Sequence, residues 1–169
     1  MAAKPIITVP DPVLRKKARR IQAIDRSIHK LARDMMDTLE KAAGLGLAAP
    51  QIGVSLRLCV LHMPEEEPCA LVNPEVVKRI GERRVVEGCL SIPGYQAKIT
   101  RSVGVTVKGL DLEGKPVRIK AVETLAQALE HEIDHVNGVL YTDYLESPDE
   151  LYKVGPEESA QVRETAHAP

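Results

Sequence analysis

The sequence predicts an α+β domain in which small, mostly antiparallel β-sheets surround one strongly marked helix. Short β-rich runs separated by glycine-containing turns fill residues 71–119, and such runs are typical of hairpins. A helix follows, because apolar residues recur there at three- and four-residue steps. This apolar stripe consists of Leu125, Leu129, Ile133, Val136 and Leu140.

The composition is that of a single globular domain. The 169 residues, 44% of them hydrophobic, are enough to close a core. Charges nearly cancel, with 23 Lys and Arg against 24 Asp and Glu and a formal net charge of −1. No global field therefore favours nucleic acid or an anionic membrane, and the absence of Phe and Trp argues against a base-stacking surface. We expect no nucleic-acid binding by the domain itself and no membrane partner.

The cysteines and the N-terminal sequence indicate the cellular compartment. The three cysteines are an odd number without repeating spacing, which argues against a secreted disulfide framework. The N-terminus lacks the apolar stretch of a signal peptide, and no apolar run approaches the roughly 20 residues of a membrane span. We predict a cytoplasmic protein, or an organellar one if a transit peptide has been removed.

Other elements can be assigned from local patterns. Apolar residues at helical steps in residues 14–39 predict one or two surface helices, broken near Arg20. A glycine-rich loop at residues 44–50 leads into a strand-like run at 54–63. The clearest hairpin turn is Asp111-Leu-Glu-Gly114.

The strongly marked helix has recognisable ends. Thr124 and Gln127 match a capping box at its start, and Asn137-Gly138 supplies its stop. Beyond the helix the chain becomes polar and acidic. We therefore predict a single domain over residues 1–145 and an acidic tail over 146–169 that is peripheral or partly disordered.

The same helix carries the run His131-Glu-Ile-Asp-His135. A spacing of four places both imidazoles on one helix face, one turn apart, where they can share a metal ion. Glu132 is offset by about 100° and is near enough to reach a bound water. The alternative is a pair of structural or solvated histidines. A chance match to H-E-x-x-H in this composition is on the order of one in a hundred, which favours the metal site.

The third ligand decides the class of enzyme, because a catalytic metal site keeps three protein ligands and one open position. In the extended H-E-x-x-H-x-x-G-x-x-H protease pattern the third ligand is a histidine. Here Gly138 matches that pattern, but the ligand position is Tyr141. Upstream, Cys89 lies in a glycine-marked bend and would complete a His₂Cys set. A cysteine taken alone is more often a small buried hydrophobe.

Three segments together resemble the peptide deformylase family. They are Gly44-Leu-Gly-Leu-Ala-Ala-Pro-Gln51, Glu87-Gly-Cys-Leu-Ser91 and Gln127-Ala-Leu-Glu-His-Glu-Ile-Asp-His-Val-Asn-Gly138. Their order and separation also match, so the combination is much more specific than any one segment. The resemblance implies a catalytic domain over residues 1–145, in which sheets surround a metal-binding helix with the H-E-x-x-H motif.

The resemblance also implies an activity and a cofactor. The family's enzymes are metal-dependent hydrolases that remove the N-formyl group from the initiator methionine of nascent polypeptides and release formate. Cys89, His131 and His135 are implied to hold one divalent ion, and Glu132 to be catalytic. The implied native ion is Fe²⁺, with Zn²⁺, Ni²⁺ or Co²⁺ as substitutes in purified protein. Expected partners are N-formylmethionyl peptides and nascent chains, with transient ribosome contact.

Further residues acquire expected roles from the same resemblance. The Gln51 amide and the Leu90 backbone N–H are the implied donors to the developing oxyanion. Gly44 and Gly46 let an extended peptide approach the loop closely.

The remaining implied residues shape the pocket and support the metal ligands. Val85 and Ala128 are expected to form walls of the methionine pocket, whereas Gln127 is polar and has the competing role of helix cap. Glu87 and Arg101 are expected to pair and so to fix the loop that carries Cys89.

Two other functions stay open. A zinc endopeptidase of the H-E-x-x-H type would need a third ligand other than cysteine. A catalytically silent module that binds nascent chains or the ribosome would need neither Glu132 nor Gln51. No basic cluster in the sequence marks a ribosome site. Glu130, directly before His131, is expected to alter the electrostatics of that ligand.

Overall fold

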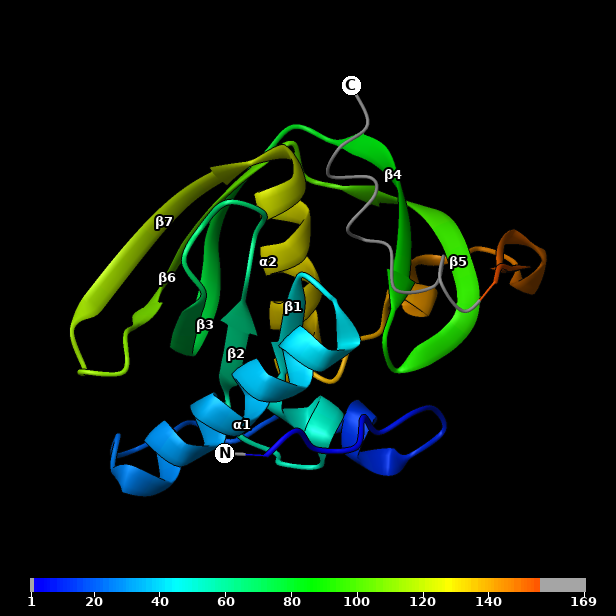
Figure 1. Cartoon of the computed structure of the whole chain (residues 1–169). Coiled ribbons are helices and arrows are strands. Elements are labelled where there is room, and N and C mark those ends of the chain that lie inside the picture. The colour runs from blue at the N-terminus through cyan, green and yellow to red at the C-terminus, as the bar shows by residue number, and fades with distance from the viewer. Residues whose placement is uncertain (1, 156–169) are drawn as a thin grey trace.

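The computed structural model describes residues 2–155 (Figure 1). Short sheets and two longer helices make up the described part of the chain. The elements in chain order are the 3-10 helix η1 (Pro12–Arg15), α1 (Arg26–Ala42), β1 (Gly46–Ala48), the 3-10 helix η2 (Ala49–Ile52), β2 (Leu58–Leu61), β3 (Cys69–Ile80), β4 (Arg83–Cys89), β5 (Ile92–Arg101), β6 (Gly104–Leu110), β7 (Pro116–Val122), α2 (Glu123–Val136), the 3-10 helices η3 (Tyr141–Tyr144) and η4 (Pro148–Glu150), and β8 (Tyr152–Lys153).

Within residues 2–155 the strands form two antiparallel sheets. One has five strands in the order β1-β2-β3-β6-β7, and the other has three in the order β4-β5-β8. Helix α2 lies between them (Figure 1). The expectation of small, antiparallel sheets around this helix is confirmed. β1 and β4 are edge strands of their sheets, which leaves backbone groups available on either side of the helix.

Helix α2 is buried on both sides. Ala126, Leu129, Ile133 and Val136 pack into a core with residues of the five-stranded sheet. On the other side Gln127 donates hydrogen bonds toward β4. A helix enclosed in this way is held rigidly, which suits side chains that must keep a fixed geometry.

Helix α1 covers the β1, β2 and β3 end of the larger sheet through a second apolar cluster that includes Ile28, Met35 and Leu39. The Asp25 side chain caps it by accepting from the N–H groups of Ser27 and Ile28. The break predicted near Arg20 is confirmed in part. Only the short η1 precedes the break, and residues 16–25 are not helical.

The predicted turn and helix stop are confirmed, whereas the predicted capping box is wrong. The Asp111–Gly114 segment joins β6 to β7, and α2 ends at Val136. No side chain caps the start of α2. The Gln127 amide instead bonds to the Val86 carbonyl and the Glu87 carboxylate. A buried carboxylate competes successfully for this donor, because an unpaired buried charge is very costly.

Part of the expected acidic tail is ordered against the smaller sheet. Within residues 146–155, η4 is followed by β8, which pairs antiparallel with Tyr95 and Gln96 of β5. Residues 156–169 lie outside the described residues, so the expected character of the tail stays a prediction there. No helix in the described part is long and apolar enough to cross a membrane.

Gly138 controls how closely the end of α2 approaches the N-terminal segment. It has φ of +75°, and a Cβ there would lie 2.6 Å from the Arg15 carbonyl oxygen. Gly94 has φ of +85° with open space around it. We therefore expect Gly138→Ala to lower the free energy of unfolding by about 2 kcal/mol more than Gly94→Ala does. Urea unfolding of the two variants measures the difference. Equal losses would show that the contact with Arg15 is unimportant.

Candidate metal centre

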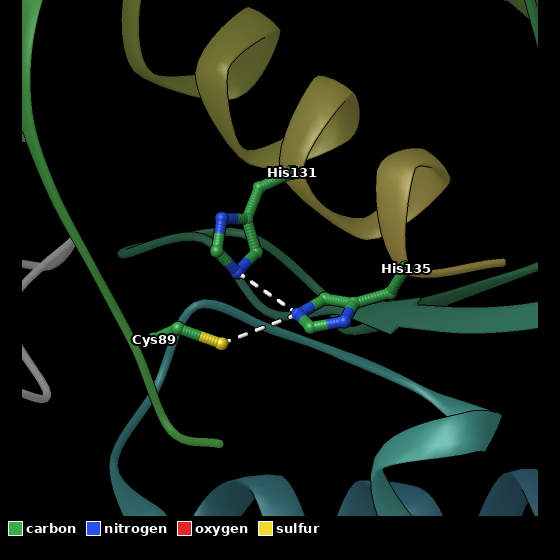
Figure 2. A group of neighbouring side chains, drawn as sticks. All are labelled: Cys89, His131 and His135. Atoms are coloured by element: carbon green, nitrogen blue, oxygen red, sulfur yellow. Dashed lines mark hydrogen bonds between the residues drawn. The ribbon is translucent and has the colours of Figure 1, made fainter. Parts of the chain in front are cut away.

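Three atoms of the kinds that ligate metals in proteins converge where β4 ends beside α2. The Cys89 Sγ lies 3.2 Å from the His135 Nε2, which lies 3.2 Å from the His131 Nε2 (Figure 2). All three ligand atoms fall within 4.8 Å of one another, and all three residues are buried. The motif spacing therefore produces the shared face that the sequence predicted.

The chemistry of these atoms fits a divalent metal ion. Tetrahedral coordination with metal–nitrogen bonds of about 2.0–2.1 Å and a metal–sulfur bond of about 2.3 Å separates ligand atoms by roughly 3.3–3.6 Å. The two separations that involve the His135 Nε2, 3.2 Å each, are close to that range. Lone-pair atoms held this close together repel unless a proton or a metal ion lies between them. Ser91 also donates its backbone N–H to the Cys89 Sγ at 3.4 Å, which helps to fix the position of the sulfur.

The Glu87 carboxylate orients the first histidine. Its Oε2 lies 2.6 Å from the His131 Nδ1, so the ring N–H is directed at Glu87 and the Nε2 faces Cys89 and His135. Arg101 donates to both carboxylate oxygens. The amide of Gln127 donates to Oε1 at 3.1 Å. The pairing of Glu87 with Arg101 is thus present, and Gln127 is an additional donor to the same carboxylate.

Burial and neighbouring charges shift the pKa values of the acidic and histidine groups in this cluster. Burial alone would raise the pKa of Glu87, but His131 and Arg101 lower it to about 2, so Glu87 is ionised. Burial disfavours a charge on His131, yet Glu87 and the nearby acidic groups raise its pKa well above the usual value. Burial and the neighbouring His131 lower the pKa of His135 well below its usual value. Positive charge is therefore favoured on the His131 ring beside Glu87, whereas His135 is neutral, as a metal ligand must be.

The Arg101 guanidinium links this cluster to residues that sequence reasoning missed. Its Nη1 donates to Asp134 at 2.7 Å, and the Tyr144 hydroxyl donates to the same carboxylate at 2.8 Å. Asp134 occupies a variable position of the motif and carries no local signal of this role. Ser91 was missed for the same reason, since its contact with Cys89 depends on a tight bend.

Glu130 was expected to alter the electrostatics of His131, but the contacts of Glu130 do not support this expectation. Its carboxylate accepts from the backbone and hydroxyl of Ser102 and from Arg79. Consecutive residues of a helix point about 100° apart, so a neighbour in sequence need not face the same site.

Glu132 lies beside the ligands with one carboxylate oxygen, Oε1, that has no hydrogen-bond partner among the described residues. Burial raises the pKa of Glu132 to about 7, partly offset by His131. A carboxyl group poised near neutrality can both accept and return a proton. Gly46 is needed here, because a Cβ at that position would lie 2.6 Å from the Glu132 Oε2.

The Gln51 amide is fixed by two hydrogen bonds. Its Oε1 accepts from the Ala48 N–H at 2.9 Å, and its Nε2 donates to the Ser91 hydroxyl at 3.1 Å. The Nε2 also lies 3.8 Å from the Cys89 Sγ. The donor end of the amide is therefore directed at the ligand cluster.

A pocket opens directly onto these groups. Most of the predicted site residues line it, and the list comprises Gly44, Gly46, Gln51, Cys89, Leu90, Ala128, His131 and Glu132. Val85 does not line this pocket and packs instead in a buried cluster with Cys89 and Ile99. The structure thus brings Ala128 to the pocket but not Val85, and His135 is buried without lining the pocket.

Proteins of similar sequence and similar fold are known. Residues 3–150 match the family model described as polypeptide deformylase. A peptide deformylase of Dehalococcoides mccartyi is 52% identical over 167 residues, covering 97% of this chain and 100% of the relative. A crystal structure of a peptide deformylase from Legionella pneumophila superposes with a TM-score of 0.84 at 43% identity, covering 98% of this chain and 94% of the other. A structure from Synechococcus elongatus, in complex with actinonin, gives 0.83 at 39% identity, with 88% and 83% covered.

Fold and relatives together define a metal-dependent hydrolase. The chain belongs to the polypeptide deformylase family, and it removes the N-formyl group from the initiator methionine of nascent polypeptides. The endopeptidase and the silent binding module are not favoured, because near full-length relatives carry the deformylase name.

The contacts of Glu87 predict its effect on metal affinity. Glu87→Gln removes the charge that orients His131, so we expect the dissociation constant for Zn²⁺ to rise about 10–100-fold. Glu130→Gln is a matched control, because Glu130 is also buried but faces Ser102. It should change the constant less than about threefold. Competition with a chromogenic chelator measures both, and equal effects would exclude the proposed orientation.

Proposed function

We propose that Cys89, His131 and His135 hold a single divalent ion and that Glu132 moves the protons of the deformylation reaction. The observation that carries this proposal is the convergence of three ligand atoms next to a buried carboxylate that has an unpartnered oxygen. When bound, the ion supplies Lewis acidity, which makes a water more acidic and offsets negative charge on a carbonyl oxygen.

Glu132 acts first as a base and then as an acid. It accepts a proton from the water that attacks the formyl carbon. It then returns the proton to the amine nitrogen as the bond between carbon and nitrogen breaks. The products are formate and a free amino terminus, and Glu132 ends in its starting state. Its pKa of about 7 reflects burial, and a cation held between His131 and Cys89 would lower it.

Gln51 and Leu90 are the proposed donors to the oxyanion. Negative charge develops on the formyl oxygen during attack, and fixed donors stabilise it without reorganising. The two hydrogen bonds of Gln51 support this role, since they hold its Nε2 toward the ligand cluster. Leu90 lines the same pocket.

The substrate is proposed to lie along the loop at Gly44 and Gly46. Edge strands β1 and β4 flank the pocket and can pair with an extended peptide. Ala128 is proposed as a wall of the methionine pocket. Val85 remains part of this proposal only if the cluster around it opens when the methionine side chain enters. Nascent chains are then the natural substrate, while ribosome contact and a cytoplasmic location stay predictions.

The assay that tests the proposal compares two peptides. Purified protein loaded with one metal ion should release formate from formyl-Met-Ala and should release no acetate from acetyl-Met-Ala, because the extra methyl group blocks the small acyl site. Mass spectrometry of the products distinguishes both from cleavage between Met and Ala. Internal cleavage, or no reaction with either peptide, would refute the proposed function.

The role of Glu132 predicts a separation of metal binding from turnover. We expect Glu132→Gln to lower kcat at least about 100-fold while metal content and melting temperature are retained. Glu130→Gln should keep most of the activity. Loss of metal from Glu132→Gln, measured by elemental analysis, would show that Glu132 is instead needed to build the site.

We propose Fe²⁺ as the native ion. The thiolate donates charge and reduces Lewis acidity, so an ion that readily expands its coordination should be a better activator than tightly held Zn²⁺. Anaerobic Fe²⁺-loaded protein should have the highest kcat. In air it should lose activity as iron and then Cys89 oxidise, while Ni²⁺-loaded protein survives. Equal activity with Zn²⁺ and an air-stable Fe²⁺ form would exclude iron.

A further inference from the structure

Two neighbouring hollows open on a face of the molecule that the proposed chemistry does not use. The first, of about 370 Å³, lies at the C-terminal end of α2 and is lined in part by Lys17, Arg57 and Arg79. The second, of about 500 Å³, is lined in part by Lys108 and Arg118 beside the β6–β7 hairpin. Arg20 lines both hollows. None of these residues lines the pocket at the metal centre.

The hollows concentrate positive charge in a chain whose net charge is −1. Six basic side chains line them, whereas Glu75 is the one acidic side chain in either lining. Glu75 lies 3.7 Å from Lys108. Lys17, Arg20 and Arg118 have no ion-pair partner among residues 2–155. Uncompensated cations that share a concave surface are a feature of anion-binding sites.

Arg57 is the preorganised member of this group. Its side chain donates to the Val136 carbonyl at 3.0 Å and to the Asn137 side chain at 2.8 Å, and the residue is only 9% exposed. Both acceptors are neutral, and no carboxylate among residues 2–155 forms an ion pair with Arg57. Burial, and then the like charge of Arg20, lower the pKa of Arg57, and Glu75 opposes this shift in part. An anion placed between Arg57 and Arg20 would relieve that repulsion.

We propose that the two hollows bind an anion that carries several phosphate groups. Guanidinium groups match phosphate oxygens, and the spread of cations over two hollows suits a series of charges better than a single one. The volumes are in the range of small-ligand sites. Leu110, Pro116 and Val117 give the second hollow an apolar wall for an organic part of the ligand.

Free oligophosphate compounds and the phosphodiester backbone of RNA present this same chemistry. No aromatic residue lines either hollow, so the contact would be with phosphates and not with stacked bases. Sequence reasoning found no basic cluster, because the contributing residues come from five separate stretches of chain between Lys17 and Arg118.

The test titrates the metal-loaded protein with inorganic tripolyphosphate in a calorimeter at about 50 mM salt. Lys17→Ala combined with Arg20→Ala should weaken binding at least about tenfold. Lys98→Ala combined with Lys153→Ala removes the same charge from the smaller sheet and should weaken it less than about twofold. Undetectable binding by the unchanged protein, or equal weakening in both double variants, would overturn the proposal.

Two further ligands define what is bound. Orthophosphate should bind at least about tenfold more weakly than tripolyphosphate, and equal affinity would refute a site for several phosphates. A short single-stranded RNA that binds more tightly than tripolyphosphate, and is weakened by the Lys17 and Arg20 changes, identifies the phosphodiester backbone as the source. RNA that binds more weakly identifies a free oligophosphate. Deformylation of formyl-Met-Ala should be unchanged in the Lys17 and Arg20 variant, since neither residue lines the pocket at the metal centre.

Discussion

The buried carboxylate of Glu87 is the contact on which the site depends. It joins β4 to α2, because it accepts from Arg101 of β5 and from Gln127 and His131 of the helix. The carboxylate is fully buried, so its charge is tolerable only while these donors remain in place. Removal of one partner of such a pair typically costs about 3–5 kcal/mol. The smaller sheet and the helix are therefore locked at one relative position.

The hydrogen bonds of Glu87 also set the direction of the proposed ligand atoms. A histidine whose Nδ1 is held by a carboxylate presents its Nε2 in one orientation, and Cys89 follows Glu87 by two residues on the same strand. The bend at Cys89 then directs the thiol back toward α2, where the Ser91 N–H supports it. The positions of two of the three proposed ligands, His131 and Cys89, thus follow from one buried ion pair and one tight turn.

Close packing around Glu132 buries its carboxylate next to the pocket. Gly46 leaves no side chain between the edge strand β1 and the carboxylate. The carboxylate is consequently shielded from solvent but still adjoins the pocket, which is the combination that gives it a pKa near neutrality.

Local patterns predicted the local features of this molecule. The apolar stripe predicted α2, the Asp111–Gly114 turn predicted a hairpin, and the spacing of His131 and His135 predicted a shared face. Cys89 needed the family resemblance, because its partners lie more than 40 residues away. The roles of Asp134 and Gln127 are tertiary contacts without a sequence signal. Gln127 was assigned to a helix cap because the pattern contains nothing about the carboxylate that it meets.

The most direct test of the account is X-ray absorption spectroscopy of the metal-loaded protein at the metal edge. The account predicts a shell with one sulfur and two imidazole nitrogens, with bond lengths near 2.3 Å and 2.0–2.1 Å for Zn²⁺. Substitution of Cys89 by Ser should then remove the sulfur contribution. A shell made only of nitrogen and oxygen in the unchanged protein would contradict the assignment of the centre.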